Sequence, residues 1–89
     1  MTGWHLALAP SAERVLARLP DRIGPAIVEF MVGPLVASPE RVGKPLQREL
    51  IGYWSARRGA YRVVYRLDHD AHTVRVVRIE HRSDVHRFR

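Results

Sequence analysis

Apolar and polar residues alternate near both ends of the chain and follow a helical period between them. Residues 4–9 (WHLALA) alternate and predict a short β-strand. Ser11 is the expected N-cap of a helix that runs to about Leu19. The apolar face of this helix is formed by Val15, Leu16 and Leu19.

A second helix is predicted directly after the first. Asp21 is its expected cap, and Gly33 and Pro34 close or kink it near its end. Because so few residues separate the two helices, we expect a helical hairpin. The apolar positions of the second helix follow the spacing i, i+4, i+7 and i+8: Ile23, Ile27, Phe30 and Met31.

The second half of the chain has the pattern of β-structure. Residues 37–45 (ASPERVGKP) are predicted to be a loop from their composition. The YWSAR and YRVVY runs on either side of Gly59 and Ala60 predict a hairpin with a tight turn. The second strand of this hairpin, residues 61–67, alternates, with Tyr61, Val63, Tyr65 and Leu67 on one face. Residues 73–80 are a β-branched run and predict one further strand.

The order strand–helix–helix–strand–strand–strand defines an α+β fold. We expect an antiparallel-rich β-sheet of four to five strands, packed on one side against the N-terminal helical hairpin. With 89 residues, the chain is expected to be one domain, 1–89, with one modest core.

Composition narrows the class of protein. Hydrophobic residues make up 46% of the chain, which indicates a folded protein, and no apolar run is long enough to span a bilayer. The chain has no cysteine, so a disulfide framework and a thiolate metal site are excluded. Since no export signal is evident, a cytoplasmic protein without a membrane partner is expected.

The positive charge lies mostly in the second half. Residues 1–52 contain six basic and five acidic side chains, whereas residues 53–89 contain nine and four, so the second part carries +5 of the net +6. All nine of its cations are arginine, whose guanidinium group binds phosphate through two hydrogen bonds and stacks on bases. RNA or DNA is therefore the first hypothesis for a partner. An arginine-rich composition caused by a GC-biased genome is the alternative.

Two arginines are expected on one face of a central strand. Arg62 and Arg66 are four residues apart, and the two-residue period of a strand places them on the same side. Arg57 or Arg58 and Arg78 can join them from the neighbouring strands. Such a surface on a rigid sheet suits phosphate chemistry. A merely solvated sheet face has the same spacing, which does not decide between the two.

Other catalytic chemistries find little support in the sequence. His69 and His72 have HxxH spacing and His81 and His86 are five apart, but no third ligand accompanies either pair, so no metal site and no cofactor are expected. The serines lack a nucleophile-elbow context, and the carboxylates are scattered. Arginine with histidine suits RNA cleavage, in which the substrate's own 2′-OH attacks the adjacent phosphate.

Two segments of the chain carry a resemblance to a known family. RVGKPLQRELIGYWSARRGAYRVVYRLD (residues 41–68) and VVRIEHRSDVHR (residues 76–87) resemble the RelE-type toxins of the RelE/ParE superfamily of bacterial toxin–antitoxin systems. The resemblance implies a fold similar to that of microbial ribonucleases and metal-independent cleavage of mRNA in the ribosomal A site. It also implies three kinds of partner: a cognate acidic RelB-like antitoxin, the ribosome with its mRNA, and operator DNA through the antitoxin complex.

The resemblance also implies site residues. Arg62 matches the arginine of the family's GYR motif, which is expected to stabilise the scissile phosphate. Arg82 lies in the C-terminal block that contributes to the active site. His86 takes the place of that block's tyrosine and is a candidate general base or stacking residue. The residues expected to bind RNA are the cations and the histidine around these three: Lys44, Arg57, Arg58, Arg78 and His81.

Four positions depart from the family's pattern. Trp54 and Ala56 stand where well-known members of the family carry two lysines. Glu80 stands where some relatives carry a catalytic arginine, although a shift of the alignment would bring Arg82 to that position. Histidine in place of tyrosine at His86 changes the ordinary pKa of that side chain from about 10 to about 6.5. Three functions therefore remain open: an mRNA endonuclease, a ParE-like inhibitor of DNA gyrase, and a catalytically weakened co-repressor.

Overall fold

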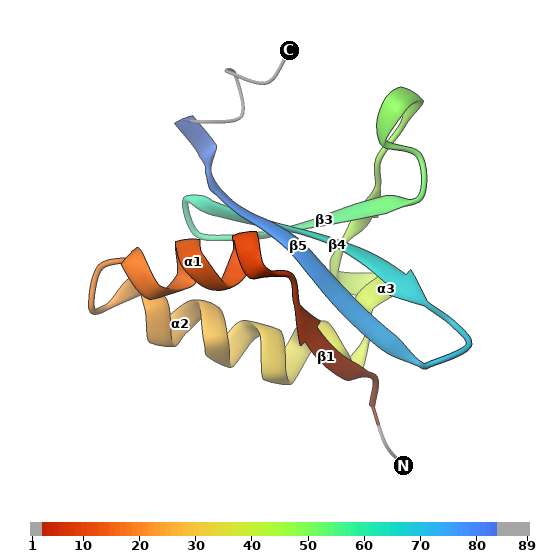
Figure 1. Cartoon of the computed structure of the whole chain (residues 1–89), viewed down its shortest axis with the longest axis horizontal. Helices are drawn as coiled ribbons and strands as arrows, with labels where there is room; N and C mark the ends of the chain where they lie inside the picture. Colours follow the sequence, from red (N-terminus) through yellow and green to blue (C-terminus); the bar gives the residue numbers. More distant parts are fainter. Residues whose placement is uncertain (1–2, 84–89) are drawn as a thin grey trace.

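The computed structural model describes residues 3–83. Two α-helices, a π-helical turn and a third, short α-helix follow the first strand, and the other four strands come after them (Figure 1). The elements are β1 (His5–Leu8), α1 (Pro10–Arg18), α2 (Ile23–Phe30), the π-helical turn (Met31–Leu35), α3 (Pro39–Val42), β2 (Lys44–Pro45), a 3-10 turn (Arg48–Leu50), β3 (Tyr53–Arg58), β4 (Tyr61–Asp68) and β5 (Thr73–His81).

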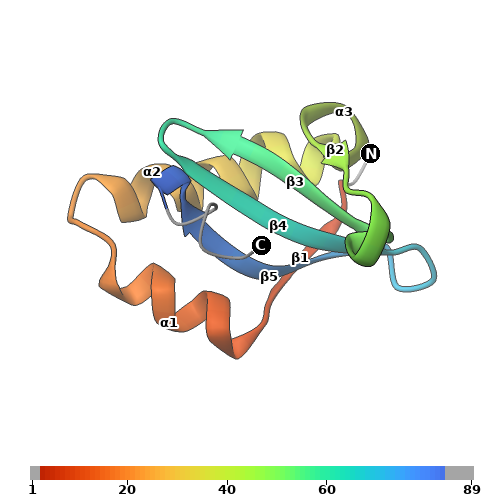
Figure 2. The ribbon, with the colours of Figure 1, turned by 90° about the horizontal axis from the view of Figure 1, so that it is seen from above.

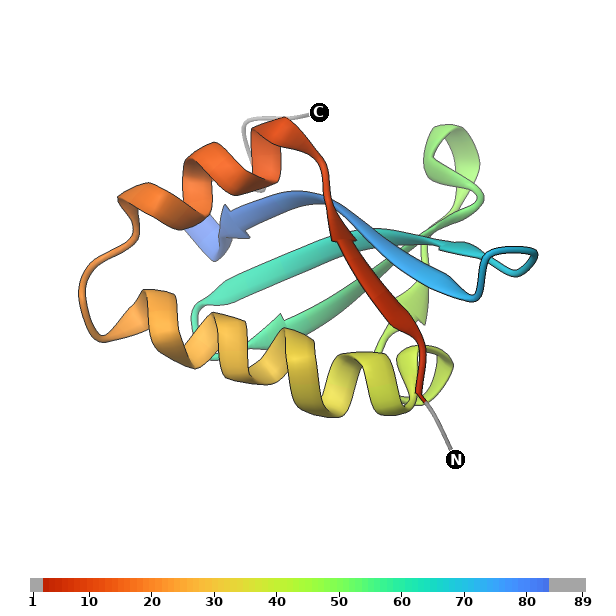
Figure 3. The ribbon, with the colours of Figure 1, turned by 60° about the horizontal axis from the view of Figure 1, so that its bottom comes forward.

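The strands form one sheet in the order β1-β5-β4-β3-β2. β1 pairs with β5 in parallel, and the other neighbours are antiparallel. The helices α1 and α2 lie along one face of this sheet, and the opposite face is open (Figures 2 and 3). The predicted α+β fold is confirmed, with five strands and the helices on one side.

The hydrophobic core fills the space between the helices and the sheet. The helical segment contributes side chains at the helical spacing predicted from the sequence, and the strands contribute every second residue of their covered face. The largest fully buried side chains are Ile27, Met31, Leu35, Val63, Tyr65, Val74 and Val76.

A β-bulge in β5 sets which side chains of this strand reach the open face. Val64 pairs with Arg78 but Tyr65 pairs with Val76, so Val77 is the extra residue. The bulge shifts the alternation by one position. After the bulge, Arg78 and Glu80 point to the open face and Ile79 to the core, so Glu80 lies beside Arg62.

The helix caps differ from the prediction. The N-cap of α1 is Ala9, with Pro10 in the first turn, and the hydroxyl group of Ser11 donates instead to the backbone oxygen of Val77 at 2.9 Å. Helix α2 begins after Arg22 without a side-chain cap, so the predicted cap at Asp21 is also wrong. Proline favours the first turn because its missing N–H needs no partner there.

The segment predicted as a loop, residues 37–45, contains the short helix α3 and the edge strand β2. Tertiary contacts override its loop-like composition. The hydroxyl group of Tyr65 donates to the backbone oxygen of Pro39 at 2.5 Å. A side chain at Gly43 would meet that hydroxyl group. Burial, and secondarily the negative charge of Glu40, raises the pKa of Tyr65 to about 12.

The predicted break at Gly33 and Pro34 is confirmed as a π-helical turn that contains Pro34. The helical path continues through it, so Met31 and Leu35 both remain buried. Within residues 3–83, no helix is long and apolar enough to cross a membrane.

Candidate active site

Rows of opposed residues cross the open face of the sheet. Arg57 of β3 pairs with Arg62 of β4, and Arg62 pairs with Glu80 of β5. Opposed residues of an antiparallel pair point to the same side, so these three side chains share the open face. A second row lies two residues farther from the β3–β4 turn and consists of Ser55, Val64 and Arg78. Lys44 of the edge strand β2 pairs with Ser55.

A third row lies at the other end of the strands. Arg66 pairs with Tyr53 on one side and with Arg75 on the other. The guanidinium carbon of Arg66 lies 5.4 Å from the centre of the Tyr53 ring, which is a cation–π contact. The register thus places Arg62 and Arg66 on one face, as the two-residue period predicts.

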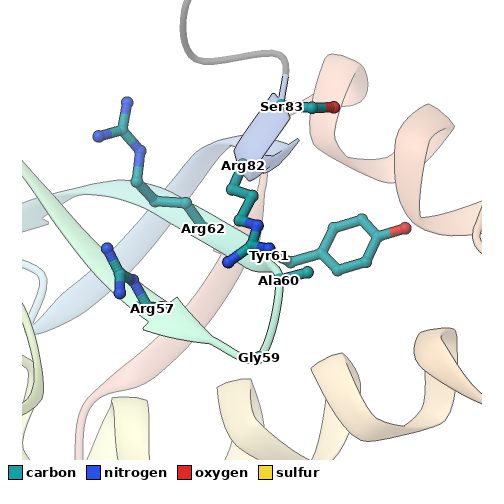
Figure 4. Close-up of a pocket in the computed structure, with 7 residues that line it drawn as sticks. All are labelled: Arg57, Gly59, Ala60, Tyr61, Arg62, Arg82 and Ser83. Carbon is teal, nitrogen blue, oxygen red and sulfur yellow. The ribbon is translucent and has the colours of Figure 1, made fainter.

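The tight turn between β3 and β4 borders a pocket with a volume of about 390 Å³ (Figure 4). Gly59 has a φ of +61°, which glycine adopts without strain. The backbone N–H of Arg82 donates to the backbone oxygen of Ala60 at 2.7 Å, which attaches the end of β5 to this turn. The residues that line the pocket are Arg57, Gly59, Ala60, Tyr61, Arg62, Arg82 and Ser83.

Arg62 lies between Arg57 and Glu80 in the first row of the open face. Its Nη2 donates to Oε1 of Glu80 at 3.1 Å, and the other carboxylate oxygen of Glu80 accepts from Nη1 of Arg78 at 3.0 Å. The Nε atom of Arg62 is buried and has no hydrogen-bond partner among the described residues. A buried donor without an acceptor is costly, and it suits a site that gains its acceptor from a ligand.

The structure brings together only some of the residues predicted to bind RNA. Lys44, Arg57 and Arg78 lie on the open face with Arg62, although Lys44 is on the far edge of the sheet. His86, the third predicted catalytic residue, lies outside the described residues.

Arg58 and His81 lie on the opposite face of the sheet from Arg62. Arg58 pairs with Tyr61, whose ring points toward the helices, and borders a hollow formed with Phe30 and Glu29 (Figure 4). His81 packs edge-on against the Tyr61 ring at 5.1 Å between ring centres. Successive side chains of a strand point to opposite faces, so Arg58 lies on the other face from Arg57, and His81 on the other face from Glu80.

Trp54 and Ala56, the positions matched to two lysines of well-known family members, lie on the covered face of the sheet. Trp54 stacks near the buried Tyr65, at 6.5 Å between ring centres, and Ala56 is buried in the core. Residues at these positions face the helices and cannot reach the pocket. The positions of β3 that share the face of Arg62 are Tyr53, Ser55 and Arg57.

Sequence reasoning missed Tyr53 and the role of Glu80 as a shared acceptor. Tyr53 could have been found by counting back in steps of two from Arg57. Glu80 could not, because the bulge at Val77 changes the register and leaves no signal in a single sequence.

His69 and His72, the histidines with HxxH spacing, both pack against the ring of Trp4. His72 stacks on Trp4 with ring centres 4.2 Å apart, and His69 meets the same ring edge-on at 5.3 Å. Within residues 3–83, no three His, Asp or Glu side chains are placed so that they could hold a metal ion together.

The described residues thus form a five-stranded sheet with helices on one face and an arginine-lined pocket at a hairpin turn. The model of the ParE toxin family of type II toxin–antitoxin systems matches residues 6–86, and the chain belongs to this family. The resemblance seen in the sequence is therefore confirmed.

Two toxins of Mycobacterium tuberculosis are close relatives. Toxin RelE is 49% identical over 85 residues, which cover 96% of this chain and 88% of the relative. Toxin RelG is 53% identical over 77 residues, which cover 86% of this chain and 88% of the relative.

Solved structures agree with the fold. The toxin–antitoxin complex RelBE2 of Mycobacterium tuberculosis matches with a TM-score of 0.87 and 48% identity, over 91% of this chain and 100% of the matched chain. The isolated E. coli RelE toxin matches with a TM-score of 0.73 at 17% identity, over 94% of this chain and 92% of that one, which supports the fold alone.

Proposed function

We propose that this toxin is a ribosome-dependent mRNA endonuclease that inhibits translation. The observation that supports the proposal most strongly is the convergence of Arg57, Arg62 and Arg82 on one pocket. These side chains come from two strands and from the residue after a third, so the sheet fixes their spacing. Several guanidinium groups around one cavity suit a phosphodiester whose charge increases in the transition state.

In the proposed reaction, the 2′-OH of the substrate attacks the adjacent phosphorus. A base takes the proton from the 2′-oxygen, the bond from phosphorus to the 5′-oxygen breaks, and an acid gives a proton to the leaving 5′-oxygen. The products are a 2′,3′-cyclic phosphate and a 5′-hydroxyl end. Arg62 and Arg82 stabilise the phosphorane, and His86 is the proposed base.

The hydrogen bonds of Arg62 support its assigned role. Its bond to Glu80 uses Nη2, and the buried Nε–H has no acceptor among the described residues. Arginine binds phosphate most firmly when two of its N–H groups donate to two oxygens. A phosphate that reaches this group after a small movement of neighbouring side chains would provide the acceptor that Nε lacks.

A RelB-like antitoxin is the proposed inhibitor. The matched structure of RelBE2 is a toxin–antitoxin complex, and its toxin is close in sequence to this chain. Operator DNA is the proposed partner of the joint complex, and the cytoplasm, where the ribosomes are, is the proposed location.

Gyrase inhibition is the second candidate function, because the matching family bears the name of the ParE toxins. A protein that acts by binding alone has no need for an arginine-lined pocket, and the two named relatives are RelE and RelG. A catalytically weakened co-repressor is the third candidate, since Glu80 stands where some relatives are expected to carry an arginine.

One experiment separates the three candidates. The protein is induced without its antitoxin, and the 5′ ends of cellular mRNA are mapped. Cuts inside translated messages, in phase with codons, are the expected result. An SOS response without such cuts would favour the gyrase inhibitor, and normal growth would favour the weakened co-repressor.

A further inference from the structure

Glu80 is the single buried charged side chain among residues 3–83, and it lies beneath two arginines of the open face. Its side chain is 5% exposed, compared with 30% for Arg62 and 53% for Arg78. Each carboxylate oxygen accepts from a different guanidinium group, at 3.1 Å and 3.0 Å. One carboxylate therefore joins two arginines from adjacent strands.

The surroundings of Glu80 strengthen these ion pairs. A second pocket, of about 170 Å³, is lined by Glu80, Arg62 and Arg78 and, beside them, by Leu46, Leu50, Tyr53, Val64 and Val77. Charges beside apolar groups are less screened by water, so a hydrogen-bonded ion pair holds its geometry more firmly there. A buried carboxylate without its partners would be strongly disfavoured.

We propose that Glu80 is a positioning residue of the nuclease, which holds the Arg62 guanidinium group in the orientation that the scissile phosphate requires. This inference rests on the proposed function and deepens it. The bond to Glu80 uses one nitrogen of Arg62 and leaves its other donors for the phosphate. Arg78 balances the carboxylate from the other side, so that the three side chains together keep a charge of +1 (two arginines and one glutamate).

A competing role for Glu80 would be to imitate the phosphate and block Arg62. The exposures argue against this role. Glu80 lies deeper than both arginines, so an incoming phosphate meets the guanidinium groups first. A carboxylate that supports an arginine from below fixes its orientation without occupying the outer side of the group.

The test measures single-turnover cleavage of a defined mRNA on programmed ribosomes by the wild type and by Glu80→Gln. We expect the rate at saturating ribosome concentration to fall about tenfold, because a loosened arginine stabilises the transition state less well. The half-saturating concentration should stay the same or fall, since a negative charge near the phosphate has been removed. Glu13→Gln, which removes the same charge from the first turn of α1, should leave both quantities unchanged.

The outcomes separate the possible roles. A variant that cuts faster than the wild type would make Glu80 a competitor of the phosphate and overturn the proposal. An unchanged rate would overturn it as well, and so would a higher half-saturating concentration at an unchanged rate.

A spectroscopic readout distinguishes failure of this inference from failure of the proposed function. The Nε–H signal of Arg62, recorded by NMR on the isolated protein and assigned with Arg62→Lys, should report a restricted guanidinium group in the wild type and a mobile one in Glu80→Gln. If the wild type does not cut RNA, the nuclease proposal fails, and this signal still shows whether Glu80 holds Arg62. An Arg62 signal that is equally mobile in both proteins overturns the inference even when the wild type cuts.

Glu80→Asp covers the case in which Glu80→Gln does not fold. It keeps the charge but is shorter by one methylene group, so it should hold one arginine less well and cut more slowly than the wild type, by less than the fall of about tenfold expected for Glu80→Gln. A Glu80→Asp protein with wild-type cleavage and a mobile Arg62 signal would also contradict the proposal.

Discussion

Arg57 and Arg58 are adjacent in the sequence and lie on opposite faces of the same strand. Arg57 pairs with Arg62 on the open face and lines the pocket, whereas Arg58 lies on the helix side beside Phe30. The covered face contains the core and is mostly apolar, and the open face contains most of the arginines of the sheet. This comparison teaches that the position of an arginine on the pleated sheet, rather than its presence, decides whether it reaches the pocket.

The same comparison applies to the ends of the open face. The row of Arg57, Arg62 and Glu80 includes a buried carboxylate that accepts a hydrogen bond from Arg62, and it lies next to the turn that Arg82 joins. The row of Arg66 and Arg75 includes an aromatic ring instead. Only the first row contributes residues to the pocket at the turn between β3 and β4.

The largest effect is expected for Arg62→Ala. It should lower the cleavage rate by about 10²- to 10³-fold and abolish toxicity, because the main stabilising charge is lost. The variant should still bind antitoxin, as measured by co-purification. Arg66→Ala, on the same strand and the same face, is the matched control and should keep at least half of the activity. Full toxicity of Arg62→Ala would remove the main catalytic assignment.

His86→Ala should lose most of its activity, about 10²-fold, if His86 is the general base. His86→Tyr should retain activity, because tyrosine is also planar and can exchange a proton. The pH dependence of the cleavage rate gives the sharper readout: the histidine form should lose activity as the pH falls and imidazole becomes protonated. If both variants cut like the wild type, His86 has no catalytic role.

Arg57→Ala and Arg58→Ala test the comparison of the two faces directly. Arg57→Ala should slow cleavage about tenfold, since one phosphate-facing charge is lost from the pocket. Arg58→Ala removes the same charge from the other face and should change the rate less than about twofold. Equal effects in the two variants would mean that overall charge, and not the pocket, determines activity.

The smallest effect on cleavage is expected for a substitution on the covered face, Tyr65→Phe. Tyr65→Phe removes the hydrogen bond to Pro39 and should lower the free energy of unfolding by about 1 kcal/mol without changing cleavage. The pKa of Tyr65 is raised to about 12, so the folded state holds this proton more tightly than the unfolded state, where the pKa is about 10.

The sign of the pH effect follows from this difference. The contribution of Tyr65 to stability is fully present below pH 10 and is lost as the pH rises from about 10 to about 12. Denaturant titrations at pH 8 and at pH 11 should therefore show a smaller loss of stability for Tyr65→Phe than for the wild type. An equal loss in both proteins would assign the alkaline sensitivity to other groups.

Much of the fold could be predicted from the sequence because it depends on local periodicity. The alternation in residues 61–67 and the helical spacing around Ile27 are strong signals, and both elements lie where they were expected. The helix α3 was not predicted, since it depends on Tyr65, which is 26 residues away from its partner Pro39. Such long-range contacts leave no mark in a local pattern.

The site was only partly predictable for a related reason. The alternation in β4 correctly placed Arg62 and Arg66 together, because both lie on one regular strand. Which of Arg57 and Arg58 joins them depends on the register of a hairpin, and the position of Glu80 depends on a bulge. Register and bulges are set by the packing of whole strands, so a single sequence does not reveal them.

The most direct test of the central claim is cleavage of a defined mRNA on purified, programmed ribosomes by the wild type and by Arg62→Ala at equal concentrations of folded protein. We predict that the wild type cuts the mRNA in the A site and leaves a 5′-hydroxyl end on the downstream fragment. Arg62→Ala should bind the same ribosomes and cut at least 100-fold more slowly. Equal rates for the two proteins, or no cleavage by the wild type, would contradict the account.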